Sequence, residues 1–366
     1  MNILKRWFGH KEEVAGLDIG SSTIKIAQVT KTPSGYAYSR FASCPTPPMT
    51  IKDGSIVDAR VLGETIHQLM QSQGITATRL VSAVSGQSVV IRPISMTQMT
   101  ERELQHAIKF EAERYLPYSV AEAQITGRIL PGSAEGEDKM MEVLLVAAPN
   151  EMVKNTREVV TLAQATADSI DLEPFALLRA LNRGVDPEAR RQTIALINLG
   201  ASSSSINIFH DGTLRHNRTI TVAGNNFTKA IGQSLNLSFE EAEKIKKEKG
   251  VIRVEKDATP VAPTTMRIFN VIIPVLTELV TEIQRSFDYY RNRFKGESVD
   301  LVVLSGGTAK FKNIDVFISS ELSIDCQIAN PFRNISIQNV QGISPDDLEA
   351  LAPMAMVVTG LALRSE

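Results

Sequence analysis

The chain has 366 residues, which corresponds to two or three average domains or to one large two-lobed domain. It carries 39 basic and 41 acidic residues, for a formal net charge of −2, and 43% of its residues are hydrophobic. These values exclude a disordered chain, a collagen-like chain and a strongly basic nucleic-acid-binding protein. Two cysteines, Cys44 and Cys326, cannot form a disulfide framework or a zinc site by themselves, so we expect reduced thiols in a cytoplasmic protein.

The sequence contains no membrane-spanning segment, because no stretch reaches the roughly 20 nearly uninterrupted apolar residues that a spanning helix needs. No secretory signal is present either. The N-terminal tail, residues 1–13, combines basic residues with the aromatic residues Trp7 and Phe8. Two interpretations stay open: a tail that touches an anionic membrane surface, or a frayed terminus.

A repeat relates the two halves of the chain. Residues 17–23 read LDIGSST and residues 197–203 read INLGASS, each after a short apolar run. In both copies alternating apolar residues follow the turn, and a third β-rich stretch comes next, over 36–42 and 214–222. This pattern predicts a three-stranded meander in each half. A repeated meander indicates a duplicated α/β domain.

The segment between the two copies predicts a separate inserted subdomain. Residues 80–94 predict one strand, and a helix should follow with Thr100 and Glu103 as its capping box. The helix should end at Pro117. Further strands are predicted over 125–130 and 140–148, and a helix over 151–166. In the second half of the chain, we expect helices over 238–249, 265–293 and 353–364 and a buried strand over 299–304.

Three glycine turns carry the candidate chemistry. A phosphate chain needs backbone N–H donors without a Cβ in the way, which glycine and small hydroxyl residues provide at tight turns. The turns 20–23 and 200–203 are each able to wrap one side of a phosphate tail, and 306–308 can let a base or ribose lie against bare backbone. Asp18 is placed to hold Mg²⁺ through water. No GxxxxGK[ST] or strand-linked GxGxxG motif occurs, so P-loop and Rossmann nucleotide binding are unsupported.

The stretches 17–29, 194–209 and 301–308 resemble the two phosphate motifs and the adenosine motif of the actin-like ATPase superfamily. Residues 221–228 and 241–246 are similar to segments of the FtsA family, in which a glutamate and a lysine reach the ribose and base. The resemblance implies ATP and Mg²⁺ as ligands. The nucleotide-binding residues expected are Asp18, Gly20, Ser21, Ser22, Thr23, Lys25, Asn198, Gly200, Ala201, Ser202, Gly224, Glu243, Lys246, Lys247, Gly306, Gly307 and Thr308.

Residues 107–118, AIKFEAERYLPY, resemble the inserted-subdomain sequence of the PilM family of type IV pilus assembly. The implied fold is α/β: an actin-like ATPase fold of two duplicated ribonuclease-H-like lobes with an FtsA-type inserted subdomain, and ATP in the cleft between the lobes. The implied parts are a tail, 1–13; a first-lobe core, 14–92 with 164–193 and 346–366; an inserted subdomain, 93–163; a second-lobe core, 194–224 with 298–345; and an outer subdomain of the second lobe, 225–297.

This resemblance also implies a partner and a location. Members of the family bind the short N-terminal cytoplasmic tail of the inner-membrane protein PilN, and can communicate with the assembly motor ATPase. We therefore expect a cytoplasmic protein at the inner face of the inner membrane, held there through PilN, with homo-oligomers an open question. The peptide-docking residues expected are Arg92, Phe110, Arg114 and Tyr115, with the alternative that Phe110 and Tyr115 are core residues.

One residue departs from the superfamily pattern. Asn198 stands where many of these ATPases carry an aspartate. An amide cannot act as a base and is a poorer magnesium ligand, so the sequence favours nucleotide binding with at most slow ATP hydrolysis. The alternatives are an actively hydrolysing, filament-forming ATPase of FtsA type, a sugar kinase with Asp53 or Asp58 as its base, and the cytoplasmic domain of a type II secretion protein.

Overall fold

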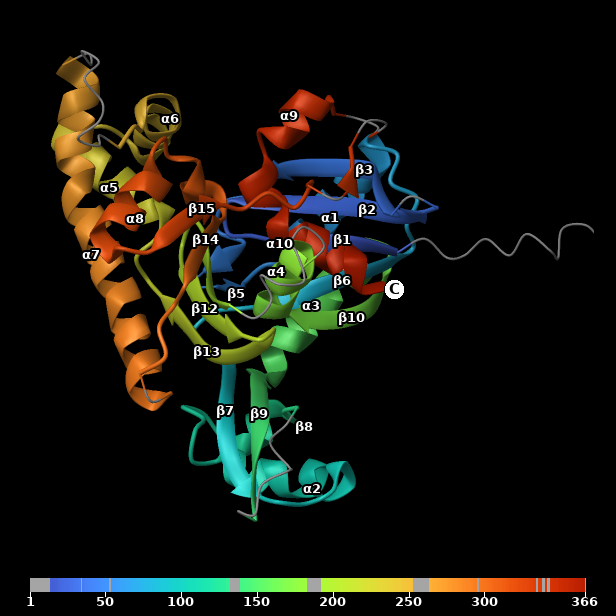
Figure 1. Cartoon of the computed structure of the whole chain (residues 1–366). Coiled ribbons are helices and arrows are strands. Elements are labelled where there is room, and N and C mark those ends of the chain that lie inside the picture. The colour runs from blue at the N-terminus through green and yellow to red at the C-terminus, as the bar shows by residue number, and fades with distance from the viewer. Residues whose placement is uncertain are drawn as a thin grey trace, which may run out of the picture. The chain divides into compact units, whose positions relative to one another are not determined.

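The computed structural model describes residues 14–33, 35–52, 54–131, 139–182, 192–252, 263–294, 296–333, 335–337, 340 and 343–365 (Figure 1). The N-terminal tail with Trp7 and Phe8 lies outside the described residues, as does Asp53. Contacts divide the chain into two units. Unit 1 comprises residues 1–84, 152–184 and 331–366, and unit 2 comprises residues 85–151 and 185–330.

Unit 1 is built on a six-stranded sheet with the order β10-β6-β1-β2-β3-β16. The predicted first meander forms its centre, because β1, β2 and β3 pair in antiparallel fashion. The strands β6, β10 and β16 add in parallel to their neighbours. The strand bounds are β1 Val14–Ile19, β2 Thr23–Thr32, β3 Gly35–Pro45, β6 Arg79–Val84, β10 Thr166–Leu172 and β16 Ile335–Ser336, with a small hairpin of β4 Ile51–Lys52 and β5 Ser55–Ile56.

Helices cover both faces of this sheet. Ile24 and Ile26 of β2 pack with α1 and α3, whereas the alternate residue Ala27 packs with α10. Gly16 allows α10 to approach β1 closely, since a Cβ there would lie 2.4 Å from the Val358 carbonyl oxygen. The helices of unit 1 are α1 Ala59–Ser72, α3 Asn150–Leu162, which begins at the end of unit 2, α4 Glu173–Asn182, α9 Pro345–Glu349 and α10 Ala352–Ala362.

The core of unit 2 repeats this topology. Its five strands have the order β13-β12-β11-β14-β15, with the same strand directions as β3-β2-β1-β6-β10. The duplication predicted from the two glycine turns is therefore confirmed. The bounds are β11 Thr193–Leu199, β12 Ser204–His210, β13 Thr213–Ile220, β14 Leu301–Ser305, β15 Asp325–Ile328, α5 Gly224–Leu235, α6 Phe239–Lys249, α7 Pro263–Arg293 and α8 Ile314–Leu322.

The inserted segment forms a three-stranded sheet, β7-β9-β8, with α2 against it. The Thr100–Glu103 capping box at the start of α2 is confirmed. The single strand expected over residues 80–94 is wrong: a turn near Gly86 splits it between two sheets, with β6 in unit 1 and β7 in unit 2. The bounds are β7 Val90–Thr97, α2 Glu101–Ala112, β8 Ala123–Ile129 and β9 Met140–Pro149.

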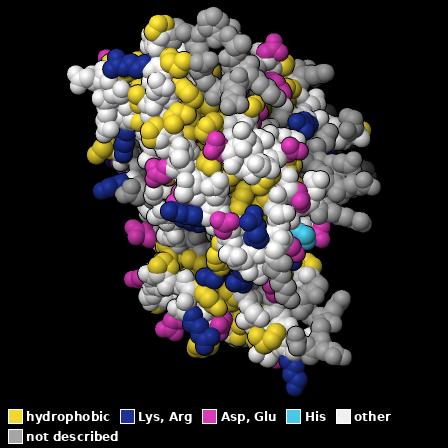
Figure 2. All heavy atoms as spheres, turned by 60° about the vertical axis from the view of Figure 1, so that its left-hand side comes forward, with side chains coloured by type: hydrophobic (Ala, Val, Ile, Leu, Met, Phe, Trp, Pro, Cys, Tyr) yellow, Lys and Arg dark blue, Asp and Glu magenta, His cyan; other side chains and the backbone are white. Residues whose placement is uncertain are grey.

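The face of the molecule drawn in Figure 2 is mixed in charge, as the near-neutral composition predicts. On the face in Figure 2, basic, acidic and hydrophobic side chains are interspersed. Within the described part of the chain, every helix is too short or too polar to traverse a lipid bilayer.

Candidate functional site

The first glycine turn connects β1 to β2 and is held from two sides. The Gly20 N–H donates to the Thr23 carbonyl at 3.2 Å, and a Cβ on Gly20 would lie 2.8 Å from the same oxygen. Thr46 fixes the other side, because its hydroxyl donates to the Gly20 carbonyl at 2.6 Å and its N–H donates to the Ser22 carbonyl at 3.0 Å. The turn is therefore preorganised, with Ser21 and Ser22 at its tip.

Asp18 and Lys25 lie opposite each other on β1 and β2. The Lys25 ammonium is 2.7 Å from Asp18 Oδ2, and both side chains are largely buried. Among the described residues, no group of three or more His, Cys, Asp or Glu side chains could hold a metal ion directly. Asp18 is a single carboxylate already paired with Lys25, so a Mg²⁺ ion here would be held through its water shell, which this ion largely keeps.

The structure joins the second glycine turn to the two other predicted segments of unit 2. The Gly200 carbonyl accepts from the Gly224 N–H at 2.9 Å and from the Thr308 hydroxyl at 3.1 Å. The Ala201 carbonyl accepts from the Asn225 N–H at 2.8 Å. The β11–β12 turn, with Ser202, is therefore bonded to the N-terminus of α5, where the positive end of the helix dipole favours anions.

Gly306 begins the third turn, directly after β14. Its φ is +90°, and a Cβ would lie 2.4 Å from the Leu199 carbonyl oxygen and 2.7 Å from Asn198 Oδ1. Only glycine fits there. At Gly307 a Cβ would meet no atom within 4 Å, so the backbone is bare on that side. In this turn, Gly306 is therefore required for the close approach to β11, whereas the Cα of Gly307 has free space beside it.

Helix α6 completes the cluster in unit 2 with charged side chains. Glu243 Oε2 lies 2.5 Å from Lys246 Nζ and accepts from the Thr228 hydroxyl at 2.5 Å. Lys246 also donates to the Gly224 carbonyl at 3.1 Å, which connects α6 to the start of α5. Lys247 is 3.3 Å from Glu243 and mostly exposed.

These contacts shift the pKa values of the Glu243–Lys246 ion pair. Burial raises the pKa of Glu243, but hydrogen bonds from Lys246 and Thr228 and the nearby positive charges outweigh it, so the net pKa lies below the ordinary value. Burial lowers the pKa of Lys246, against the opposing effect of Glu243. The ion pair presents both an acceptor and a donor close to the glycine turns.

Sequence reasoning missed Thr228 and Thr46. Thr228 lies one helical turn after Gly224 on α5, and only the helical register would have placed its hydroxyl beside that glycine. Thr46 lies beyond the end of β3, and no local pattern connects it to the first turn. The side chain of Asp58, considered as a kinase base, accepts a hydrogen bond from the Val61 N–H at 3.0 Å and caps α1 instead.

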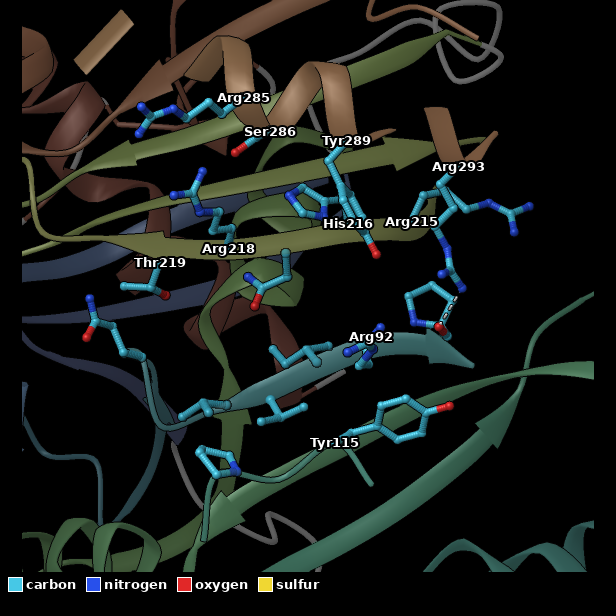
Figure 3. A pocket seen from close by; sticks show the side chains of 18 residues that line it. Arg92, Tyr115, Arg215, His216, Arg218, Thr219, Arg285, Ser286, Tyr289 and Arg293 are labelled. Atoms are coloured by element: carbon cyan, nitrogen blue, oxygen red, sulfur yellow. Dashed lines mark hydrogen bonds between the residues drawn. The ribbon is translucent and has the colours of Figure 1, made fainter. Parts of the chain in front are cut away.

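The four expected peptide residues occupy two places in unit 2. The Arg92 guanidinium lies 4.6 Å from the centre of the Tyr115 ring, and both residues line a groove of 740 Å³ (Figure 3). Phe110 is 79% exposed on α2, which contradicts the alternative that it is a core residue. Arg114 is exposed in the turn that follows α2 and pairs with Glu111 at 3.0 Å.

The groove also contains residues that the sequence did not indicate. Strand β13 contributes Arg215, His216 and Arg218, and α7 contributes Arg285 and Arg293. These side chains are distant in sequence from β7, so only the tertiary fold brings them together with Arg92.

Comparison with known proteins gives a family and a fold. The family model for the type IV pilus assembly protein PilM matches residues 16–366. The cell division protein FtsA of Bacillus subtilis is 23% identical over 88% of this chain and 79% of its own length. FtsA of Escherichia coli K12 is 21% identical over 82% of this chain and 80% of its own length.

Two solved structures extend the comparison. A PilM-PilN type IV pilus biogenesis complex matches with a TM-score of 0.83 and 28% identity, over 96% of this chain and 98% of that chain. MreB5 of Spiroplasma citri bound to AMPPNP matches with a TM-score of 0.54 and 14% identity, over 97% and 96%. The actin-like ATPase fold expected from the glycine turns is confirmed by these likenesses.

Proposed function

Because this chain belongs to the PilM family of type IV pilus assembly proteins, we propose that it is an ATP-binding scaffold of the pilus assembly complex. In this proposal it binds the N-terminal cytoplasmic tail of PilN at the inner face of the inner membrane and links that tail to the assembly motor. The likeness to a solved PilM-PilN complex supports the partner. Its membrane association would be indirect, through PilN.

The observation that carries nucleotide binding is the cluster around Gly200 in unit 2. One carbonyl there accepts from both Gly224 and Thr308, so three glycine-containing segments meet at one point. We infer that the turn around Gly200 holds phosphate oxygens, that Glu243 and Lys246 contact the ribose and base, and that the bare backbone at Gly307 lies against adenosine. Bound ATP would supply the phosphate charge that the positive end of the α5 dipole and the Lys246 ammonium favour.

In unit 1, the corresponding proposal concerns Asp18, Lys25 and the 20–23 turn. The turn would contact phosphate, Asp18 would hold Mg²⁺ through water, and Lys25 would offer a positive charge beside both. Asn198 lacks a carboxylate and cannot accept a proton from water. The proposal therefore includes slow ATP hydrolysis at most. Nucleotide binding itself is supported by the MreB5 structure, which has the same fold and is bound to AMPPNP.

Nucleotide identification tests this part. The protein is purified quickly and denatured, and the released nucleotide is chromatographed and counted per chain. We expect mainly ATP, with phosphate release raised at least about tenfold by Asn198→Asp, since a general base typically contributes 10²–10⁴-fold. Asn236→Asp, an amide-to-acid change at the end of α5, should change neither the bound nucleotide nor the rate of phosphate release. Mostly ADP from the unaltered protein, together with filaments in a sedimentation assay, would favour the hydrolysing FtsA-type alternative.

The partner is tested separately with a labelled synthetic peptide of the PilN tail. We propose that the tail docks on the inserted subdomain, with the exposed Phe110 of α2 as an aromatic anchor, Arg114 in the turn after α2, and the Arg92–Tyr115 pair as further contacts. Phe110→Ala should weaken binding about tenfold or more, as loss of an aromatic anchor does. Phe239→Ala, which removes an exposed phenylalanine from α6, is the matched control. Equal affinity for the two variants would argue against this docking surface.

A further inference from the structure

The chain between β3 and α1 carries the two most exposed large hydrophobic side chains that the structure describes in unit 1. Met49 is 90% exposed and Val57 is 63% exposed. They lie on the two stretches that flank the β4–β5 hairpin, residues 46–50 and 56–58, which together are called the connecting segment below. Exposure alone is ordinary for single hydrophobic residues at a surface. The backbone that presents them is not ordinary.

The backbone at Met49 has a φ of +64°, in the left-handed region that residues other than glycine rarely adopt. Thr50, which is 3% exposed, holds this conformation, because its hydroxyl donates to the Pro47 carbonyl at 2.6 Å. The Thr50 carbonyl accepts from the N–H groups of Val57 and Asp58 at 2.8 and 3.3 Å. One buried residue therefore joins both stretches of the connecting segment. A strained backbone of this kind persists only while its surroundings enforce it.

Thr46 connects this segment to the first glycine turn. Its hydroxyl donates to the Gly20 carbonyl at 2.6 Å, and its N–H donates to the Ser22 carbonyl at 3.0 Å. In a trans peptide group the C=O and the N–H point in opposite directions, so the N–H groups of Ser21 and Thr23, which share these two peptide groups, point away from Thr46. An anion that accepts from either N–H polarises its peptide group and strengthens the hydrogen bond at the carbonyl. The contacts of Thr46 are therefore sensitive to what the turn binds.

Two prolines stiffen the path from Thr46 to Met49. Pro47 and Pro48 are the only residues between them, and the proline ring fixes φ at about −65°. Since a peptide chain otherwise has two soft dihedral angles per residue, this stretch has few left to absorb a displacement. A shift of Thr46 is thus passed on to the strained position.

We propose that the connecting segment is a switch that senses phosphate on the first glycine turn. With phosphate bound, the Thr46 contacts tighten and Met49 is held in its left-handed conformation; without it, the segment relaxes, and Met49 and Val57 change position at the surface. This inference rests on the nucleotide binding proposed above and adds how that binding is signalled to the surface of unit 1. ATP shifts such an equilibrium only by binding its two states with different affinity, so loss of the Thr46 contact should also weaken ATP binding.

Hydrogen–deuterium exchange of the full-length protein, with and without saturating MgATP, tests the switch. Three of the residues 45–48 are prolines, which have no N–H, so exchange in this stretch reports on the Thr46 amide alone. We expect MgATP to slow exchange in the connecting segment at least about fivefold and to leave β8 of unit 2 unchanged, because hydrogen-bonded amides exchange only when their local structure opens. Calorimetry on the same sample measures ATP binding independently.

Three variants locate the signal. Thr46→Val removes the hydroxyl contact to Gly20, so saturating MgATP should slow exchange in residues 56–58 less than about twofold, whereas Thr46→Ser should retain the full effect. Thr65→Val is the matched control, because the Thr65 hydroxyl also donates to a carbonyl, that of Val61 at 2.7 Å, but within α1. It should respond to MgATP as the unaltered protein does. Circular dichroism checks that each variant is folded.

The outcomes separate the switch from nucleotide binding. Unchanged exchange in the connecting segment of the unaltered protein, while calorimetry shows that ATP is bound, would overturn the switch and leave the nucleotide proposal standing. The full effect of MgATP in Thr46→Val would also overturn it, because the signal would then not pass through the Thr46 hydroxyl. Absence of ATP binding to the unaltered protein would overturn both proposals.

Discussion

Thr228 is a single side chain on which the charged half of the candidate nucleotide site depends. Its buried hydroxyl donates to Glu243 and accepts from Lys246 Nζ at 2.8 Å. Thr228→Val keeps the shape but leaves both charged groups short of a partner, a cost of about 1–3 kcal/mol. We expect ATP affinity, measured by calorimetry, to fall about tenfold or more, and Thr228→Ser to restore it.

Thr277→Val is the matched control, because the Thr277 hydroxyl donates to the Ile273 carbonyl at 3.1 Å on the exposed side of α7, away from any charged partner among the described residues. If Thr228→Val bound ATP as tightly as the unaltered protein, the role of Glu243 and Lys246 in binding would have to be abandoned. The melting temperature of Thr228→Val is measured alongside. An unchanged value would show that weaker ATP binding comes from the altered site and not from unfolding.

His216 predicts how stability depends on pH. Burial, followed by the charges of Arg218, Arg293 and Arg92, lowers its pKa to about 4 in the folded protein, against an ordinary 6.5. As pH falls from 6.5 toward 4, the unfolded chain takes up a proton that the folded chain refuses, so stability is lost over this window, by at most about 3 kcal/mol. His216→Gln should flatten the urea-unfolding profile between these pH values. His106→Gln, at an exposed position on α2, should follow the unaltered protein; an unchanged slope in His216→Gln would contradict the assignment.

At the scale of elements, the sequence predicted what is local. The two glycine turns, the Thr100–Glu103 capping box and the helix over 265–293 are each predicted from residues close together in the chain, and the structure contains them. The strand expected over 80–94 was wrong because β6 and β7 are both rich in apolar residues, and the five residues between them, 85–89, contain one glycine, Gly86, as a turn signal. The groove could not be predicted, since β7, β13 and α7 supply its arginines from distant parts of the chain.

The β14 turn gives a prediction in which two neighbouring glycines behave differently. Gly306→Ala places a Cβ against the Leu199 carbonyl at a φ of +90°, so it should destabilise the protein by several kcal/mol in urea unfolding. Gly307→Ala meets no atom of the described chain and should leave stability within about 1 kcal/mol. If adenosine lies over that bare backbone, Gly307→Ala should still weaken ATP binding. Unchanged ATP affinity in this variant would remove Gly307 from the site.

At the scale of the whole molecule, the inserted subdomain enters the chain between β6 and α3 of unit 1, yet its contacts group it with unit 2. β7 packs against β13, and two interactions add to this packing: Arg215 of β13 pairs with Glu142 of β9, and Arg293 of α7 donates to the Pro93 carbonyl of β7. We expect Arg215→Gln to raise deuterium uptake in β7 and β9 while leaving α1 and β2 unchanged. The loss should be about 1 kcal/mol, because the Arg215–Glu142 pair is only partly exposed. Arg114→Gln removes an ion pair between the end of α2 and the turn that follows it, and should not change uptake in either strand. Uptake that rose equally in both variants would mean that packing of β7 against β13, rather than these side chains, holds the subdomain to unit 2.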